Sequence, residues 1–323
     1  MNITILGTGA YGLALSSMFL ENNCNITMWT KLEDEKERLE KERCNKLVLP
    51  NYQISTKIKL TTNLELAVNN ADVIVIAIPV KFVSSVVIEL AKYYQKKQHI
   101  CIASKGIEQD SCLFINSIIR KYIKTNKICV ISGGTFAVDM IKKVPIGLSI
   151  ASTNKATIKI MKKTLQNEYL KLVPTKDVFG VEMYGAIKNV IAIAGGIIDG
   201  MGYPESTKCM FITKSLNDIV NLIYEMGGNK KTILTYAGIG DLLLTCNSVK
   251  SRNYSFGKMI GNKTDKKIID EYQKTTTIEG LYTLKSIYDL IHHKNIKMPI
   301  IDIIYGIIYE NKEIILLENY LKK

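Results

Sequence analysis

The residue with the clearest chemical potential is Lys188, which stands in an apolar stretch running from Gly180 to Gly202. Helical spacing places small side chains and one acid within roughly 60° of this lysine: Gly185, Ala192, Gly195 and Asp199. Burial lowers the pKa of a lysine, and such a lysine can donate and accept protons near neutral pH. The alternative is a structural lysine that forms an ion pair with Glu182 or Asp199. The small residues leave room in front of the amine, and they favour the proton-transfer role.

A glycine-rich turn near the N-terminus is the second chemical feature. Its sequence, GTGAYG, matches the pattern GxGxxG and lies between a predicted strand and a predicted helix. In that context the glycines permit a tight turn, close approach of a pyrophosphate and close helix packing. The free N–H groups of the helix would face the phosphates. We therefore expect dinucleotide contacts at Gly7, Gly9, Ala10, Tyr11 and Gly12.

The end of the next predicted strand bears on the choice of dinucleotide. A site selective for NADH usually has Asp or Glu there to hold the ribose hydroxyls. This chain has Thr30 and Lys31 instead, and its first acids come later, at Glu33 and Asp34. Because Lys31 can bind a 2′-phosphate, the sequence favours NADPH, with NADH left open.

The order of predicted elements indicates how these features are positioned. Apolar runs predict strands at 3–6, 25–29, 71–78, 99–103, 128–132 and 145–150, with helical segments between them. From about Val181 to the C-terminus, apolar residues recur at helical spacing. The fold class is therefore α/β, with a Rossmann-like, mostly parallel sheet domain followed by an all-helical domain. We expect the dinucleotide-binding domain at 1–180 and the substrate-binding and catalytic domain at 181–323.

The composition narrows the class of protein. The 323 residues are 47% hydrophobic and 23% charged, as in a soluble enzyme of two domains. No apolar run reaches about 18 residues, and no signal peptide precedes the first strand, so a cytoplasmic protein without stable membrane insertion is expected. The 7 cysteines lack metal-ligand spacing, and no metal is expected. The net charge is +13, but aromatic residues do not alternate with the basic residues, which argues against a nucleic-acid partner. A positive charge suits an anionic substrate and an anionic cofactor.

Several further motifs occur in a fixed order along the chain. They are Ser104–Glu108 (SKGIE), Ser132–Ala137 (SGGTFA), Gly185–Asn189 (GAIKN), Ala237–Leu242 (AGIGDL), Thr245-Cys246, Ser251–Asn253 (SRN) and Ile278–Gly280 (IEG). Together with the glycine-rich turn they closely resemble NAD(P)-dependent glycerol-3-phosphate dehydrogenase of the bacterial, soluble type, over nearly the whole chain. The resemblance implies reduction of dihydroxyacetone phosphate to sn-glycerol 3-phosphate, a precursor of glycerophospholipids.

The resemblance also implies roles for individual residues. Lys188 is the implied catalytic acid/base, and Lys105 is implied to touch both substrate and cofactor. The other implied substrate contacts are Gly133, Thr135, Asp241, Ser251, Arg252 and Asn253. Implied cofactor contacts outside the glycine-rich turn and Lys31 are Ala137, Arg252 and Glu279. The chain departs from the family at Gly134, where proline is usual.

Two alternatives stay open. A related two-domain dehydrogenase acting on a hydroxy acid would need a carboxylate clamp, whereas the Ser251–Asn253 triplet suits phosphate. The apolar C-terminal helices, at 300–309 and 314–321, either form a homodimer contact, which we expect, or close the second domain.

Overall fold

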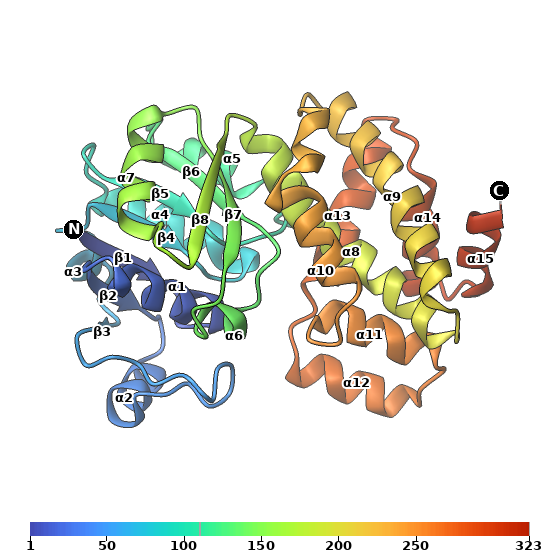
Figure 1. Cartoon of the computed structure of the whole chain (residues 1–323), viewed down its shortest axis with the longest axis horizontal. Helices are drawn as coiled ribbons and strands as arrows, with labels where there is room; N and C mark the ends of the chain where they lie inside the picture. Colours follow the sequence, from blue (N-terminus) through green and yellow to red (C-terminus); the bar gives the residue numbers. More distant parts are fainter. Residues whose placement is uncertain (110, 323) are drawn as a thin grey trace. The chain divides into compact units, whose positions relative to one another are not determined.

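The computed structural model describes residues 1–109 and 111–322 and divides into two compact units (Figure 1). The first unit comprises Met1–Lys105 and Ile115–Val178, and the second comprises Gly106–Phe114 and Phe179–Lys323. Each unit has its own hydrophobic core. Ile107 and Phe114 lie in the core of the second unit, which explains why this short segment groups with it.

The first unit is built on a sheet with the strand order β3-β2-β1-β4-β5-β6-β7-β8. The strands are β1 (Asn2–Leu6), β2 (Asn25–Trp29), β3 (Lys59–Thr61), β4 (Val73–Ile76), β5 (His99–Ile102), β6 (Ile128–Ser132), β7 (Ile146–Ala151) and β8 (Leu170–Thr175). All neighbouring pairs are parallel except β6 and β7. The mostly parallel sheet that the sequence predicts is confirmed, with the addition of β3 and β8 at its two edges.

Helices cover both faces of this sheet (Figure 1). The helical segments of this unit are α1 (Ala10–Glu21), α2 (Glu33–Glu42), α3 (Leu64–Val68), the short helix η1 (Val80–Phe82), α4 (Val83–Tyr93), α5 (Ile115–Tyr122), α6 (Ala137–Met140) and α7 (Lys155–Leu165). Consecutive residues of β1 point to opposite faces. Ile5 faces Gly12 of α1, whereas the hydroxyl of Thr4 donates to the carbonyl of Ala67 in α3. The apolar strands are therefore buried from both sides.

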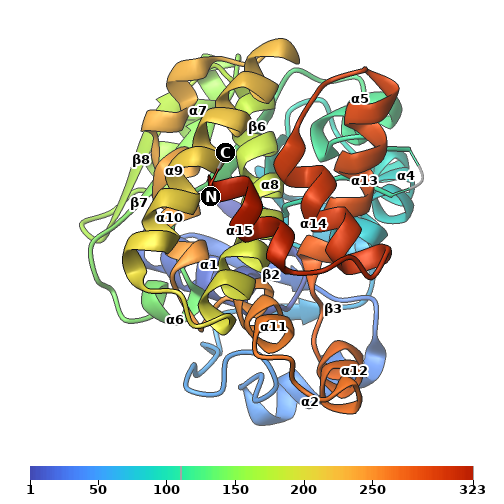
Figure 2. The same ribbon diagram turned by 90° about the vertical axis from the view of Figure 1, so that its right-hand side faces the viewer.

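The second unit is helical in its described residues, apart from one isolated bridge between Ile107 and Phe114. Its elements are α8 (Val178–Gly200), α9 (Glu205–Glu225), η2 (Lys230–Leu234), η3 (Tyr236–Gly240), α10 (Asp241–Cys246), α11 (Arg252–Gly261), α12 (Lys266–Thr275), α13 (Glu279–His293), α14 (Pro299–Tyr309) and α15 (Ile315–Lys322). Residues of α9, α13 and α14 pack around α8 in the core (Figure 2). By length and composition α8 could cross a membrane, but 94% of its most apolar window is buried inside the protein. That burial is what the core helix of a globular unit shows.

Candidate active site

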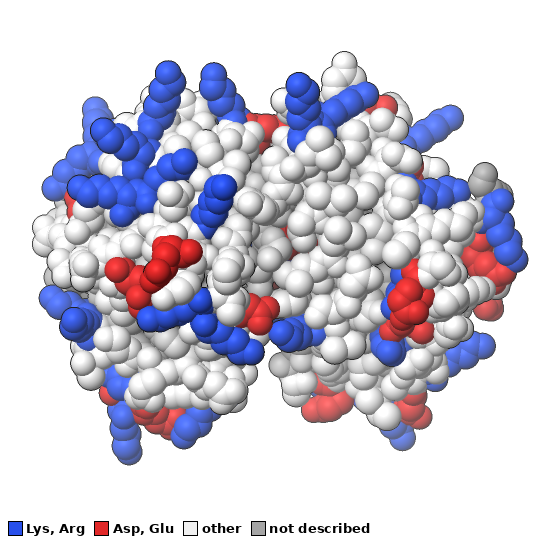
Figure 3. Space-filling model, in the orientation of Figure 1, with Lys and Arg blue, Asp and Glu red and all other residues white. Residues whose placement is uncertain are grey.

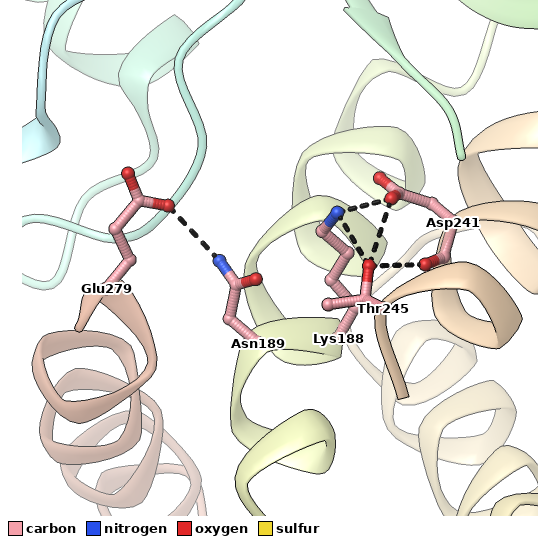
Figure 4. Close-up of polar contacts among 5 residues, drawn as sticks. All are labelled: Lys188, Asn189, Asp241, Thr245 and Glu279. Carbon is pink, nitrogen blue, oxygen red and sulfur yellow. Dashed lines mark hydrogen bonds and ion pairs between the residues drawn. The ribbon is translucent and has the colours of Figure 1, made fainter. Parts of the chain in front are cut away.

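The second unit contains a buried cluster around Lys188. The ammonium group of Lys188 on α8 forms an ion pair with the carboxylate of Asp241 and donates a hydrogen bond to Thr245 Oγ1 at 3.1 Å (Figure 4). The side chains of Lys188 and Asp241 are only 10% and 1% exposed. The Thr245 hydroxyl donates in turn to the backbone carbonyl of Asp241 at 2.6 Å. The carboxylate stabilises the charged form of the lysine, and the threonine fixes where the ammonium group lies.

The structure contradicts the alternative in which Lys188 forms an ion pair with Asp199. Asp199 lies three turns along α8, but its carboxylate pairs with Lys208 of α9 at 3.1 Å and with Lys258 of α11 at 2.7 Å. Helical periodicity identifies only neighbours on the same helix. Asp241 comes from a separate helix, 53 residues later.

The local backbone explains why Asp241 can reach this position. Asp241 begins α10 directly after the π-helical turn η3. Within that turn Gly238 has φ −83° and ψ −109°, and a Cβ there would lie 2.4 Å from the carbonyl oxygen of Ile233. Thr245 follows one helical turn after Asp241, so both side chains lie on the same face of α10.

A second polar group lies at the start of α11 and α13. Asn189, next to Lys188, donates to Glu279 Oε2 at 3.3 Å (Figure 4), and Glu279 Oε1 lies 4.0 Å from Arg252 Nη2. Asn253 Oδ1 accepts the backbone N–H of Gly280 at 2.8 Å. The Arg252 side chain is 55% exposed, so its guanidinium fork is accessible to an anion. Neighbouring residues thus fix the position of Arg252 and Asn253, while the Arg252 side chain extends toward solvent.

Ser251 has a structural role at this point. Its hydroxyl accepts the backbone N–H of Tyr254 at 3.3 Å and caps the N-terminus of α11. Such a cap stabilises the first turn and fixes the position of Arg252. The N-terminus of α11 adds the partial positive charge of the helix dipole beside the guanidinium.

Glycines set the distance between α8 and α11. A Cβ at Gly257 would lie 1.9 Å from the carbonyl oxygen of Ile193, and one at Gly261 would lie 2.2 Å from that of Ile197. On the other helix, a Cβ at Gly196 would lie 2.0 Å from the carbonyl oxygen of Tyr254. The backbones therefore touch, and the helix that carries Lys188 and the helix that presents Arg252 are held in a fixed relation.

Asp199 reinforces the same helix contact. Burial raises the pKa of its carboxyl, but hydrogen bonds from Lys258, Lys208 and Tyr254 outweigh burial and lower the pKa to about 2. For Tyr254, burial followed by the Asp199 hydrogen bond raises the pKa to about 12. Asp199 is therefore ionised, and Tyr254 protonated, at any pH near neutrality.

The glycine-rich turn of the first unit fits a dinucleotide. Gly7 has φ +119°, and a Cβ on it would lie 2.5 Å from Ala77 O, while one on Gly12 would lie 2.6 Å from Gly7 O. A Cβ on Gly9, by contrast, would meet nothing within 4 Å. The turn is thus tightly packed at Gly7 and Gly12 and open at Gly9. Gly9 is the N-cap of α1 and provides no side-chain hydrogen bond to the first turn of that helix. That open space and the uncapped N–H groups suit a pyrophosphate.

The structure adds a carboxylate at the end of β2 that sequence reasoning missed. Thr30 donates its hydroxyl to Glu35 in the first turn of α2, so an acidic side chain reaches the end of this strand. Lys31 is exposed beside it. Both a partner for ribose hydroxyls and a partner for a 2′-phosphate are therefore present, and the preference for NADPH stays a prediction.

The remaining predicted contacts of the first unit follow strands that run in the same direction as β1. Lys105 comes after β5, while Gly133 and Thr135 come after β6, and Ala137 begins α6. A Cβ at Gly133 would lie 2.7 Å from Gly147 O of β7, which explains this glycine. Thr135 Oγ1 is buried and has no hydrogen-bond partner among the residues that the structure describes. A buried hydroxyl of this kind suits a ligand contact.

Sequence reasoning left two contributors to these clusters unassigned. Asn189 stands beside Lys188 in the GAIKN motif, and Thr245 lies one helical turn after Asp241. The i, i+4 spacing of Asp241 and Thr245 is the signal that places them on one face.

Comparison with known proteins agrees with this architecture. Residues 2–158 match the family model of the NAD-dependent glycerol-3-phosphate dehydrogenase N-terminus, and residues 177–317 match that of the C-terminus. Glycerol-3-phosphate dehydrogenase [NAD(P)+] of Fusobacterium nucleatum is 34% identical, with 97% of this chain and 93% of the relative covered. That of Lactobacillus helveticus is 35% identical, with 97% and 94% covered.

Solved structures agree as well. The crystal structure of glycerol-3-phosphate dehydrogenase from Coxiella burnetii has a TM-score of 0.94 and 28% identity, covering 100% of this chain and 99% of that one. A D-mandelate dehydrogenase structure shares the fold at a TM-score of 0.62 and 13% identity, covering 100% of both chains. The chain belongs to the NAD-dependent glycerol-3-phosphate dehydrogenase family.

Proposed function

We propose that this chain reduces dihydroxyacetone phosphate to sn-glycerol 3-phosphate with NADPH or NADH, and that Lys188 is its proton donor. The observation that carries the proposal is the buried Lys188–Asp241–Thr245 cluster, in a chain that matches both family models. A buried ammonium group with an anchored position is suited to a proton transfer at one defined atom.

The protein's part in the reaction follows from this cluster. A bound reduced nicotinamide supplies the hydride that adds to the ketone carbon. Lys188 donates a proton to the ketone oxygen as negative charge develops there, which gives the alcohol and leaves a neutral amine that regains its proton from water. Asp241 stabilises the ammonium form before transfer, and Thr245 keeps Nζ aimed at one position.

The phosphate of the substrate should bind a positively charged side chain that donates hydrogen bonds in defined directions. Arg252 supplies a planar fork at the N-terminus of α11, with Ser251 and Asn253 holding that turn in place. We assign Lys105, Gly133 and Thr135 to the substrate as well. The buried hydroxyl of Thr135, which has no hydrogen-bond partner within residues 1–109 and 111–322, supports its place in this set.

The cofactor contacts proposed are those of the glycine-rich turn together with Lys31, Lys105, Ala137, Arg252 and Glu279. The open space beside Gly9 and the uncapped start of α1 support the first of these. Glu279 is held by Asn189 and lies near Arg252, so substituting it should also alter the phosphate site.

Location and assembly are further parts of the proposal. We place the protein in the cytoplasm, without stable membrane insertion and without a nucleic-acid partner, and we expect a homodimer. Burial of α8 within the second unit supports the absence of insertion. Light scattering coupled to gel filtration tests the assembly, and a monomeric mass at all concentrations would contradict it.

The activity itself is tested by following oxidation of NADPH and of NADH at 340 nm with dihydroxyacetone phosphate. We expect substrate-dependent oxidation of at least one cofactor. Oxidation with a 2-oxo acid but not with dihydroxyacetone phosphate would contradict the proposal and indicate a hydroxy-acid dehydrogenase. A parallel reaction with unphosphorylated dihydroxyacetone should be far slower, because Arg252 then lacks its anion.

A further inference from the structure

The positive charge of this chain is concentrated in one part of it. Residues 91–176 contain 16 Lys and Arg but only 4 Asp and Glu, a net charge of +12 out of the total of +13. The rest of the chain has 27 basic and 26 acidic residues, so it is close to neutral. A general enrichment in lysine would raise the charge of every segment, and it does not account for this distribution.

Helix α7 shows the concentration most clearly. Its only charged residues are four lysines, and at about 100° per residue they share an arc of roughly 100°: Lys155, Lys159, Lys162 and Lys163. Lys162 is half-buried and the other three are exposed. None has a carboxylate within ion-pair distance among residues 1–109 and 111–322. Lys162 and Lys163 lie in the last turn, where they complement the helix dipole. Lys155 and Lys159 have no such role, and like charges at i, i+4 spacing repel each other, so helix stability does not account for the whole pattern.

A basic hollow adjoins the N-terminus of α7. A pocket of about 450 Å³ is lined by Lys96, Lys124, Thr125, Asn126 and Lys127. Asn154, the N-cap of α7, donates its side-chain amide to Asn126 Oδ1 at 3.3 Å, which joins the hollow to the helix. Figure 3 shows basic side chains gathered over α7 and its surroundings, with few acidic ones among them. We call Lys96, Lys124, Lys127 and the four lysines of α7 the polybasic face.

The polybasic face is separate from the predicted cofactor contacts of the same unit. Lys96 and Lys127 precede β5 and β6, at the amino ends of these strands. Gly7, Lys105 and Gly133 follow β1, β5 and β6, at the carboxyl ends. An anionic partner on this face would therefore leave the glycine-rich turn accessible.

We propose that the polybasic face binds the surface of a lipid bilayer that contains anionic phospholipids. Clusters of four to eight basic residues are attracted to such surfaces at short range, without inserting into them. Of the 16 basic residues in 91–176, only Arg120 is an arginine, and α7 has no aromatic residue. Nucleic-acid sites favour arginine forks and aromatic stacking, whereas lysines act as point charges toward headgroups.

The proposal is tested by co-sedimentation of the full chain with vesicles. Vesicles of phosphatidylcholine alone are compared with vesicles that also contain phosphatidylglycerol, at low and at high NaCl. Lys155, Lys159, Lys162 and Lys163 are changed together to Gln. The matched control changes four exposed lysines of the second unit to Gln: Lys266, Lys267, Lys274 and Lys285.

We expect binding only to the anionic vesicles and release by salt. The α7 variant should bind roughly 600-fold more weakly, since each of the four lysines contributes about fivefold. The control variant should bind like the wild type, and both variants should retain full dehydrogenase turnover, which shows that they are folded. Equal binding by the α7 variant and the wild type, salt-insensitive binding, or no binding to anionic vesicles would each overturn the proposal. Tighter binding to a random DNA duplex than to the vesicles would overturn it in favour of a nucleic-acid partner.

Discussion

The contact between α8 and α11 makes a quantitative prediction for Gly257→Ala. The added methyl group would lie 1.9 Å from Ile193 O, and real Cβ contacts are essentially never closer than 3.0 Å. The two backbones must therefore separate by about 1.1 Å at this point. Overpacking against a rigid neighbour reduces the free energy of unfolding by about 1–3 kcal/mol. Replacing a helical glycine by alanine offsets up to about 1 kcal/mol of this loss.

The displacement should affect catalysis more than stability. It moves the turn that presents Arg252 relative to Lys188 by about the distance that misaligns a substrate, which lowers kcat/KM by about 100-fold. The loss should fall mainly on KM for dihydroxyacetone phosphate. The affinity for NADPH should fall less, because Arg252 is the only one of its proposed contacts that lies on α11. Steady-state kinetics and urea unfolding measure the two effects.

A graded control is available on α8. A Cβ at Gly195 would lie 3.3 Å from Cys246 O, so Gly195→Ala requires a shift of only a few tenths of an ångström. The free energy of unfolding of this variant should stay within about 1 kcal/mol of the wild type. If Gly257→Ala matched the wild type in both stability and KM, backbone contact between the helices would not position the phosphate site.

Three other substitutions test separate parts of the account. Asp241→Asn removes the counter-charge of buried Lys188 and should lower the free energy of unfolding by about 3–5 kcal/mol in urea titrations, together with kcat; an unchanged unfolding curve would contradict the buried ion pair. Lys31→Asp should shift the ratio of kcat/KM values from NADPH toward NADH, and an unaltered ratio would show that Lys31 does not select the cofactor. The pKa of the Asp199 carboxyl is lowered from its ordinary 3.8 to about 2. Its ionised form therefore stabilises the fold above about pH 4, and this contribution is lost as the pH falls toward 2. The stability difference between the wild type and Asp199→Asn should accordingly shrink below pH 4, whereas a difference that grows there would contradict this.

Much of the fold is predictable from local pattern. Apolar runs identify the central strands because a parallel strand covered on both faces is apolar throughout. The edge strands lack this signal: β3 has three residues, and β8 contains Lys171 and Pro174. Edge strands pair with a neighbour on one side only, so they tolerate lysine and proline.

The candidate site is less predictable, because its contacts join distant segments. Periodicity within α8 indicates that Lys188 is buried but identifies Asp199 as its neighbour, whereas the ion pair is made with Asp241. The kink at Gly238 that places Asp241 has no periodic signal. Ser251 illustrates a second limit, since the same residue type serves as a helix cap and as a phosphate donor.

The central claim, that Lys188 is the proton donor, is tested most directly by single-turnover reduction of dihydroxyacetone phosphate by Lys188→Ala. With both ligands saturating, the rate of NADPH oxidation should fall by at least about 100-fold, as expected when a general acid is removed. The affinity for NADPH, measured by fluorescence titration, should stay close to that of the wild type. A variant that binds NADPH normally and retains a rate within a few-fold of the wild type would contradict the assignment of Lys188.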